Sequence, residues 1–282
     1  NPDQNNLDHV TGTENEDGDK QKNLDIIADK IIKKFVEKNN IKWYASEEND
    51  KILHLDKEGF FSLCVDPLDG SSNIETNAPI GMIFSIYEAF ENANDSIFQC
   101  GNKQISSGFI IFGPRTIFLL TLGFGTIAFQ LNASNQFLMI NNKVDIPEKT
   151  SEFSINMSNY KKWNNDVRMY IDICLEGQSG IRKKKYNMRW VGSLVSDAWR
   201  IFSRGGIFLY TADKRKGYEK GRLRLIYEAN PISFLVEQAN GKATNGEVSI
   251  LSIKPSHLHE RVPLIFGSEE EVKFYQSILL KK

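Results

Sequence analysis

Five short apolar runs follow one another through the middle third of the 282-residue sequence, and they constrain the fold more than any other feature. They are rich in Ile, Phe, Leu and Gly and are bounded by turn residues. The runs are Pro79 to Ala89, Ile105 to Phe112, Thr116 to Leu122, Thr126 to Leu131 and Gln136 to Ile140. Short strands at this turn-bounded spacing predict a multi-stranded sheet. The rest of the chain must supply the layers that cover it.

Helical and strand patterns alternate on both sides of this region. The apolar spacing of Leu24, Ile27, Ile31 and Phe35 predicts an amphipathic helix over Asn23 to Asn39. Further helices are predicted over Trp163 to Leu175, Leu194 to Phe202, Arg222 to Gln238 (broken or kinked at Pro231) and Glu269 to Leu280. Further strands are predicted over Ile41 to Ala45, Phe60 to Val65, Ile207 to Thr211 and Val248 to Ile253. This alternation predicts a layered α/β protein, preceded by a polar, mobile segment over residues 1–22.

Composition excludes several classes of protein. With 40% hydrophobic and 25% charged residues, the chain is neither disordered nor collagen-like nor a coiled coil. Its three cysteines are far apart, which argues against a disulfide framework or a structural zinc site and favours a reducing compartment. The longest apolar run, Ile117 to Phe129, is too short to span a bilayer. Because the sequence begins at Asn1 rather than Met, we expect a processed or N-terminally incomplete chain.

The net charge of −1 conceals a separation of charge along the chain. Residues 1–75 hold 17 Asp and Glu against 9 Lys and Arg, whereas residues 182–224 hold 13 Lys and Arg against 3 Asp and Glu. A protein that holds both a divalent cation and an anionic ligand needs both signs of charge. Two solvated faces explain the same pattern, and we interpret Arg182 to Lys185 as a solvated basic loop.

The densest run of polar chemistry is Asp66-Pro67-Leu68-Asp69-Gly70-Ser71-Ser72-Asn73, which follows a predicted strand. Asp66 and Asp69 can converge on one cation because a turn at Pro67 would fold the chain back. Gly70 allows close backbone approach, and Ser71-Ser72 can open a helix whose free N–H groups suit a phosphate. A turn that caps a helix is the alternative. The full run favours a combined metal and phosphate site.

Three further acidic positions are ambiguous in isolation. Glu47 and Glu48 are adjacent after a predicted strand, so their side chains diverge and one could bind a metal while the other faces a water or a second metal. Alone, that pair would be assigned to a solvated loop, and Glu228 to the surface of an amphipathic helix. Asp25 could equally be a first-turn charge that favours the helix dipole.

The sequence resembles class I fructose-1,6-bisphosphatase, of the lithium-sensitive sugar- and inositol-phosphatase superfamily, from about Gly18 to its C-terminus. The resemblance rests on Gly18-Asp19 with Leu24-Asp25, Glu47-Glu48, Asp66 to Asn73, Ser154-Ile155-Asn156, Arg189 to Ser193, Gly205 to Tyr210 and Leu223 to Pro231. It implies an α/β fold, a layered α-β-α-β-α sandwich. A metal-binding, sheet-rich part would span residues 1–150 and a sugar-phosphate-binding α/β part residues 151–282.

The resemblance also implies the residues that hold metal ions and activate water. The implied metal ligands are Glu47, Glu48, Asp66, the Leu68 carbonyl, Asp69 and Glu228. Oxygen ligands without His or Cys suit Mg²⁺, or alternatively Mn²⁺, rather than zinc. Asp25 and Glu48 would polarise the attacking water, Asp19 would close onto the site from a mobile loop, and Arg224 would lie near the reacting phosphate.

The implied substrate is a sugar bisphosphate whose second phosphate is held but not cleaved. Gly70, Ser71 and Ser72 would approach the reacting phosphate. By resemblance, Asn156, Tyr210 and Arg222 would hold the 6-phosphate, and Arg189 would reach it from a neighbouring subunit of a homodimer or homotetramer. Arg222 stands where the family commonly has Lys, and Asn159 and Trp190 stand near or at family Tyr positions.

The leading hypothesis is therefore a Mg²⁺-dependent, cytoplasmic phosphatase that releases the 1-phosphate of fructose 1,6-bisphosphate in gluconeogenesis. Sedoheptulose-1,7-bisphosphatase or a dual enzyme is the alternative within the class, and a non-catalytic sugar-phosphate sensor is a less favoured one. We expect no membrane partner. Nucleic-acid binding is disfavoured because the aromatic residues of the basic stretch follow strand and helix periods rather than a stacking pattern.

Overall fold

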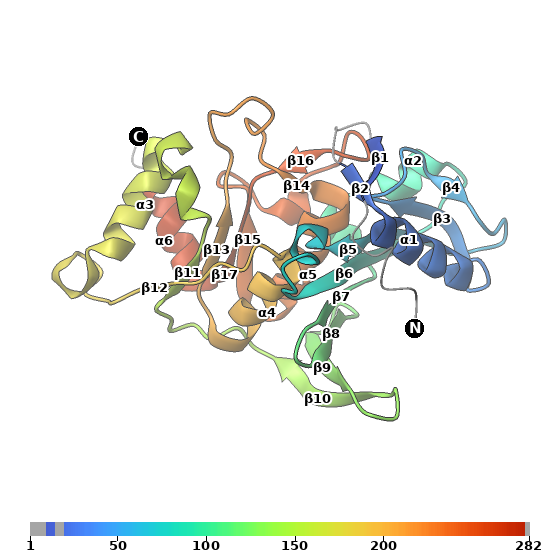
Figure 1. Cartoon of the computed structure of the whole chain (residues 1–282), viewed down its shortest axis with the longest axis horizontal. Helices are drawn as coiled ribbons and strands as arrows, with labels where there is room; N and C mark the ends of the chain where they lie inside the picture. The colour runs from blue at the N-terminus through green and yellow to red at the C-terminus, as the bar shows by residue number, and fades with distance from the viewer. Residues whose placement is uncertain (1–9, 15–19, 280–282) are drawn as a thin grey trace.

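The computed structural model describes residues 10–14 and 20–279, and its main elements form five layers in the order helix, sheet, helix, sheet, helix (Figure 1). This arrangement confirms the expected α/β sandwich. No helix in the described ranges is long and apolar enough to cross a membrane.

The larger sheet has eight strands in the order β10-β9-β8-β7-β6-β5-β3-β4. Their bounds are β3 Ile41–Ser46, β4 Leu53–His54, β5 Phe61–Asp69, β6 Ile80–Glu88, β7 Ser106–Phe112, β8 Thr116–Thr121, β9 Thr126–Leu131 and β10 Phe137–Val144. Strands β6 to β10 confirm the five apolar runs of the middle third. Only β3 and β5 pair in parallel within this sheet, a point on which the functional site depends.

The smaller sheet has five strands in the order β12-β11-β13-β17-β15. Their bounds are β11 Glu152–Ser154, β12 Asn187–Met188, β13 Ile207–Tyr210, β15 Gly241–Thr244 and β17 Leu264–Ser268. Strand β11 pairs in parallel with both β12 and β13, whereas β17 runs antiparallel to its neighbours β13 and β15.

Helices form the remaining three layers. Helix α1 (Asn23–Val36) packs on β3 and β5 at the outer face of the larger sheet. Helices α4 (Leu194–Arg204) and α5 (Asn230–Gln238) touch strands of both sheets and fill the middle layer, where the largest apolar cluster lies. Helices α3 (Asn165–Leu175) and α6 (Glu269–Leu279) pack together on the outer face of the smaller sheet.

Three of the predicted segments differ in secondary structure. Residues 10–14 and 20–22 pair as strands β1 (Val10–Glu14) and β2 (Lys20–Lys22) rather than forming a mobile segment. The stretch Val248 to Ile253 contains a 3₁₀ turn over Ile250–Ser252 instead of a strand, because its side chains follow no period of two against the sheet.

The third difference concerns Pro231. The stretch from Arg222 is not one kinked helix: β14 (Leu223–Arg224) pairs with β16 (Arg261–Val262), and a π-helical turn over Leu225–Ala229 then leads into α5. Pro231 lies in the first turn of α5, where its missing N–H group costs no hydrogen bond. It therefore starts a helix rather than breaking one.

The remaining elements are short. They are α2 (Ala93–Ile97) and 3₁₀ turns over Ser71–Asn73, Gly101–Lys103, Met157–Lys162 and Gly177–Ser179.

The basic loop before β12 is not simply solvated, which corrects our interpretation of Arg182 to Lys185. Glu271 on α6 is fully buried, and its carboxylate accepts hydrogen bonds from Arg182 Nη2 at 2.6 Å and from Lys184 Nζ at 3.3 Å. The hydroxyls of Tyr186 and Tyr170 donate to the same carboxylate. Sequence patterns could not pair these groups, because the partners lie 85 to 101 residues from Glu271.

Replacing Glu271 by Gln should therefore lower the free energy of unfolding by about 3 kcal/mol, because it leaves the largely buried Arg182 guanidinium without a counter-charge. Denaturant unfolding measures the change. The matched control is Glu269→Gln, whose exposed partner Lys273 lies at 2.9 Å and whose loss should cost no more than about 0.5 kcal/mol. Equal losses in the two variants would contradict the role given to the buried carboxylate.

Candidate metal and phosphate site

The parallel pairing of β3 and β5 brings the two acidic motifs together. Ser46 at the end of β3 pairs with Val65 of β5, and the Glu47 N–H donates to the Val65 carbonyl at 3.0 Å. Because parallel strands end at the same edge of a sheet, Glu47 and Glu48 emerge beside Asp66 and Asp69.

A third segment completes the cluster. Glu228 lies on the π-helical turn before α5, and one carboxylate oxygen each from Asp66, Asp69 and Glu228 lie within 4.8 Å of one another. All three side chains are buried. The expected turn at Pro67 is wrong. Asp66 and Asp69 both lie at the end of β5, and the chain does not reverse at Pro67 but shifts its pairing register against β6.

Burial and mutual repulsion disfavour the charged forms of these acids. Burial, followed by the charges of Glu47, Asp69 and Glu228, raises the pKa of Asp66 well above its usual value. Burial and then the charge of Glu47 do the same to the pKa of Glu228. Burial, with Asp25 as the next cause, raises the pKa of Glu48 to about 8. Converging buried carboxylates fit a hard divalent cation, which would neutralise them and prefers oxygen ligands.

Asp69 also caps α4. Its carboxylate accepts hydrogen bonds from the Ser193 hydroxyl at 3.0 Å, the Leu194 N–H at 3.2 Å and the Val195 N–H at 2.9 Å. A carboxylate has about four lone-pair positions, so this set still leaves room for a cation. One side chain therefore joins the acidic cluster to the N-terminus of the middle-layer helix.

Gly70 is required by the close contact between the acidic loop and α4. Its backbone is left-handed (φ 78°, ψ 27°), and a Cβ atom there would lie 2.8 Å from the Ser193 Cβ. The expected helix after Gly70 is only a single 3₁₀ turn over Ser71–Asn73. The phosphate-binding role of Ser71 and Ser72 stays a prediction.

Two further predicted residues lie next to the cluster. Arg224 is buried, and its Nη2 lies 3.6 Å from Glu47 Oε1. Asp25 is buried in the first turn of α1, close enough to Glu48 to raise its pKa. Asp19 lies outside the described residues. The roles assigned to these acids and to the Leu68 carbonyl stay predictions.

The residues predicted to hold the second phosphate gather around the smaller sheet. Asn156 follows β11 and Tyr210 ends β13, and these strands are parallel neighbours. Both residues line one narrow pocket together with Asn159 and Trp190. Arg222 is close enough to Tyr210 to influence its pKa. Arg189 is exposed and donates to the Met188 carbonyl at 2.9 Å, so within this chain it does not line that pocket.

The sequence analysis missed several residues that shape the site. Besides Ser193, these include Asp197, which is buried and accepts hydrogen bonds from the Ser154 hydroxyl and from the N–H groups of Val191 and Gly192. Burial raises the pKa of Asp197 to about 6 despite these bonds. The sequence feature that could have pointed to Asp197 is its place in the first turn of a predicted helix.

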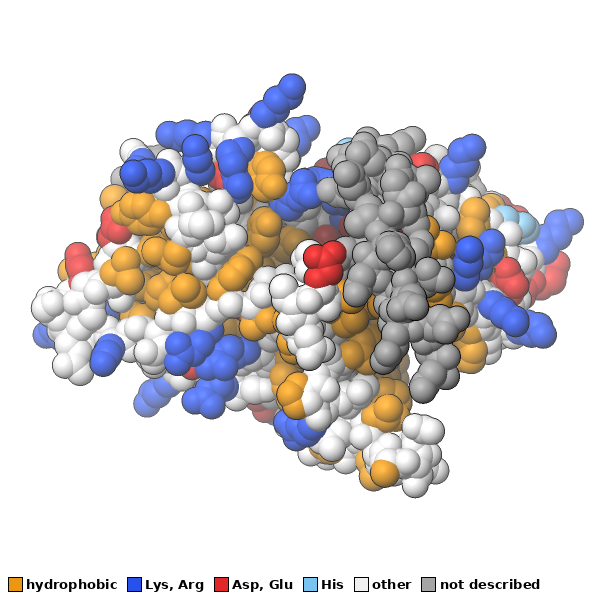
Figure 2. All heavy atoms as spheres, viewed as in Figure 1, with side chains coloured by type: hydrophobic (Ala, Val, Ile, Leu, Met, Phe, Trp, Pro, Cys, Tyr) orange, Lys and Arg blue, Asp and Glu red, His pale blue; other side chains and the backbone are white. Residues whose placement is uncertain are grey.

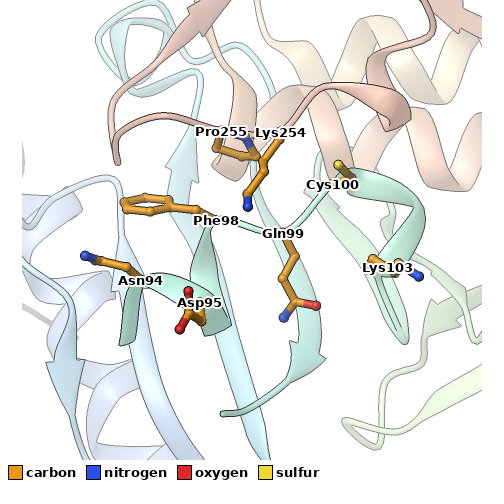
Figure 3. Close-up of a pocket in the computed structure, with 8 residues that line it drawn as sticks. All are labelled: Asn94, Asp95, Phe98, Gln99, Cys100, Lys103, Lys254 and Pro255. Atoms are coloured by element: carbon orange, nitrogen blue, oxygen red, sulfur yellow. The ribbon is translucent and has the colours of Figure 1, made fainter. Parts of the chain in front are cut away.

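A separate pocket lies beside α2, and none of the acidic-cluster residues lines it (Figure 3). In Figure 3 the Lys254 ammonium points into it, whereas Lys103 points away. Asp95 is the only carboxylate that lines it, and Cys100 hydrogen-bonds to the Ser252 carbonyl. These groups do not resemble a metal site.

Comparisons with known proteins agree along almost the whole chain. A family model described as the N-terminal domain of fructose-1-6-bisphosphatase matches residues 3–142, and one for the C-terminal domain matches residues 146–280. A class 1 fructose-1,6-bisphosphatase of Azorhizobium caulinodans is 49% identical over 269 residues, which cover 93% of this chain and 82% of the relative. One of Bradyrhizobium sp. is 46% identical over 258 residues, which cover 92% and 76%.

Solved structures show the same similarity in three dimensions. The holo form of fructose-1,6-bisphosphatase from Leishmania major superposes with a TM-score of 0.91 at 32% identity, covering 98% of this chain and 87% of that one. Its apo form gives 0.86 at the same identity, covering 92% and 85%.

Gly70→Ala should lower the free energy of unfolding by about 3 kcal/mol, because about 1–2 kcal/mol of left-handed strain adds to the clash with Ser193. The control is Gly217→Ala, which has a similar φ of +82° but open space around the new Cβ, so that only the strain remains. Thermal or denaturant unfolding compares the two. Indistinguishable losses would mean that the contact with α4 is not tight.

The raised pKa values of the acidic cluster predict an inverse pH dependence of stability without cations. Between the unfolded pKa of Glu48, near 4.5, and its folded pKa of about 8, the folded state binds more protons, so this contribution to stability falls as pH rises. In chelator, wild type should lose more thermal stability between pH 5 and pH 8 than Asp66→Asn. Added Mg²⁺ should stabilise wild type more at pH 8 than at pH 5. Parallel pH profiles for the two proteins would refute this.

Proposed function

Because the chain belongs to the class 1 fructose-1,6-bisphosphatase family, we propose that it hydrolyses fructose 1,6-bisphosphate to fructose 6-phosphate and inorganic phosphate. The observation that carries the proposal is the convergence of Asp66, Asp69 and Glu228 beside the Gly70 turn. One place in the fold would thus combine a cation site with backbone donors for a phosphate.

We assign the cation site to Mg²⁺, with Mn²⁺ as a second possibility. Asp66, Asp69, Glu228 and the Glu47–Glu48 pair would hold it, with the Leu68 carbonyl as a further oxygen ligand. Bound divalent ions supply charge neutralisation of the phosphate and lower the pKa of a bound water. The burial of the acids supports this assignment, because uncompensated carboxylates at these positions would repel one another and the substrate.

The remaining residues would orient the reactants. Glu48 and the neighbouring Asp25 would together polarise the attacking water. Asp19 would join them when its loop closes. Arg224, held beside Glu47, can donate to the oxygens of the reacting phosphate. The N–H groups of Gly70, Ser71 and Ser72 would approach the same phosphate.

The second phosphate would bind in the narrow pocket at the ends of β11 and β13 of the smaller sheet. Asn156 uses its Oδ1 to cap the turn that follows it, accepting from the Ser158 N–H and hydroxyl, so its amide NH₂ is left to donate. Tyr210 and Arg222 would add a hydroxyl and a guanidinium. Cationic and hydroxyl donors outside the acidic cluster are what a phosphate that is not cleaved requires.

A phosphate-release assay tests the function. We expect activity on fructose 1,6-bisphosphate only with Mg²⁺ or Mn²⁺, and loss of at least about a hundredfold in Asp66→Asn and Asp69→Asn, which remove a ligand charge at nearly constant volume. Sedoheptulose 1,7-bisphosphate and inositol 1-phosphate belong in the same assay: faster release from the former would reassign the enzyme to the alternative sugar bisphosphatase. Full activity in excess chelator would overturn the metal assignment.

We further propose that the active form is a homodimer or homotetramer in which Arg189 serves the neighbouring subunit. Its exposure and its absence from the pocket of its own chain support this. Mixing inactive Asp66→Asn with weakly active Arg189→Ala should restore activity, because one hybrid site is then intact. No restoration in verified mixed oligomers would argue for action within one chain. A cytoplasmic role in gluconeogenesis, supported by three free cysteines, is testable by cell fractionation and growth on non-sugar carbon.

A further inference from the structure

The loop between β13 and β14 holds one arginine in a fixed position. Asp213 is buried, and its carboxylate accepts hydrogen bonds from the Arg215 backbone N–H at 2.9 Å and from Arg215 Nε at 3.0 Å; Nη2 donates to it as well. The ring of Tyr218 lies 3.9 Å from the Arg215 Cζ, and backbone hydrogen bonds from Tyr218 to Arg215 and from Asp213 to Tyr218 close the loop. A solvated basic loop would not need a buried carboxylate to orient one of its cations.

The orientation leaves part of the guanidinium available. Asp213 occupies the edge formed by Nε and Nη2, and Nη1 makes no hydrogen bond to any residue that the structure describes. One third of the side chain is exposed. A planar guanidinium held at one edge can bind an anion with its other N–H groups, since it has five donors in all.

Arg215 belongs to the pocket proposed for the second phosphate. Arg215 lines the same narrow pocket as Asn156 and Tyr210. Asn156 has its amide NH₂ left to donate because its Oδ1 is bound to Ser158, and burial raises the pKa of Tyr210, so its hydroxyl stays protonated and can donate. Arg222 lies 5.3 Å from the same Tyr218 ring that packs on Arg215. Lys and Arg side chains gather along the top of Figure 2, where Figure 1 places this loop.

The polar groups named here are all hydrogen-bond donors except the Asp213 carboxylate, which is already bound to Arg215. Such a set of donors suits an oxyanion. We propose that Arg215, positioned by Asp213 and Tyr218, is a further cationic ligand of the phosphate that is not cleaved, alongside Arg222 of the same chain and Arg189 of the neighbouring subunit. The inference rests on the proposed function and deepens it. Each chain then supplies two guanidinium groups to its own pocket for the terminal phosphate dianion, and the pocket selects bisphosphates over sugar monophosphates that lack the distal group.

The test compares Arg215→Gln with Lys216→Gln, which removes the same charge from the same loop at an exposed position outside the pocket. For Arg215→Gln we expect KM for fructose 1,6-bisphosphate to rise about tenfold and binding of fructose 6-phosphate, measured by calorimetry, to weaken by a similar factor. KM for fructose 1-phosphate, which lacks the distal phosphate, should not change. Lys216→Gln should behave as wild type, and Arg215→Lys should recover part of the loss.

Asp213→Asn tests the positioning separately: it should reproduce the direction of the Arg215→Gln effect, with thermal unfolding confirming that the variant is folded. The proposal is overturned if Arg215→Gln matches Lys216→Gln, or if it weakens fructose 1-phosphate as much as the bisphosphate. Arg222→Ala distinguishes a failure of the proposal for Arg215 from a failure of the proposed function. If Arg222→Ala raises KM and Arg215→Gln does not, the proposed function stands without Arg215; if wild type releases no phosphate from the bisphosphate, the proposed function itself fails.

Discussion

The hydrogen bonds from the N-terminus of α4 to Asp69 are the interaction on which the rest of the structure depends. Asp69 ends a strand of the larger sheet, whereas Ser193, Leu194 and Val195 begin the helix that packs between the sheets. Burying a carboxylate costs several kcal/mol unless its oxygens are bound. Because these donors lie at the positive end of a helix, they offset that cost and fix the distance between the acidic loop and the second half of the molecule.

The same interaction limits what the site can tolerate. Asp69 serves both the helix cap and the acidic cluster. After burial and the charge of Glu47, the charge of Asp69 raises the pKa of both Asp66 and Glu228. Such repulsion is a cost of the cation-free fold, and a divalent cation would relieve it. Gly70 is part of this arrangement, since any side chain there would push the loop away from Ser193.

In each sheet, a pair of neighbouring parallel strands brings candidate functional groups together. In the larger sheet the parallel strands β3 and β5 end beside each other and deliver acids, and in the smaller sheet the parallel strands β11 and β13 deliver the donors Asn156 and Tyr210. Adjacent carboxyl ends of parallel strands form a crevice at a sheet edge. In the proposed function, the acidic and basic parts of the sequence would form two halves of one substrate site, one for cations and one for the second phosphate.

Local sequence determined the strands of the middle third, most helices and the acidic run of Asp66 to Asn73, because side-chain periodicity and turn residues act between neighbours along the chain. Family resemblance added Glu228, which no local pattern distinguished from a surface residue. Only the tertiary structure decided that Asp69 caps α4, that Arg182 and Lys184 bind a buried Glu271, and that Asp213 holds Arg215 at the pocket of Asn156. The physical reason is that burial and charge pairing depend on groups far apart in sequence. Asp69 and Val195 are 126 residues apart along the chain, yet the Val195 backbone nitrogen lies 2.9 Å from an Asp69 carboxylate oxygen.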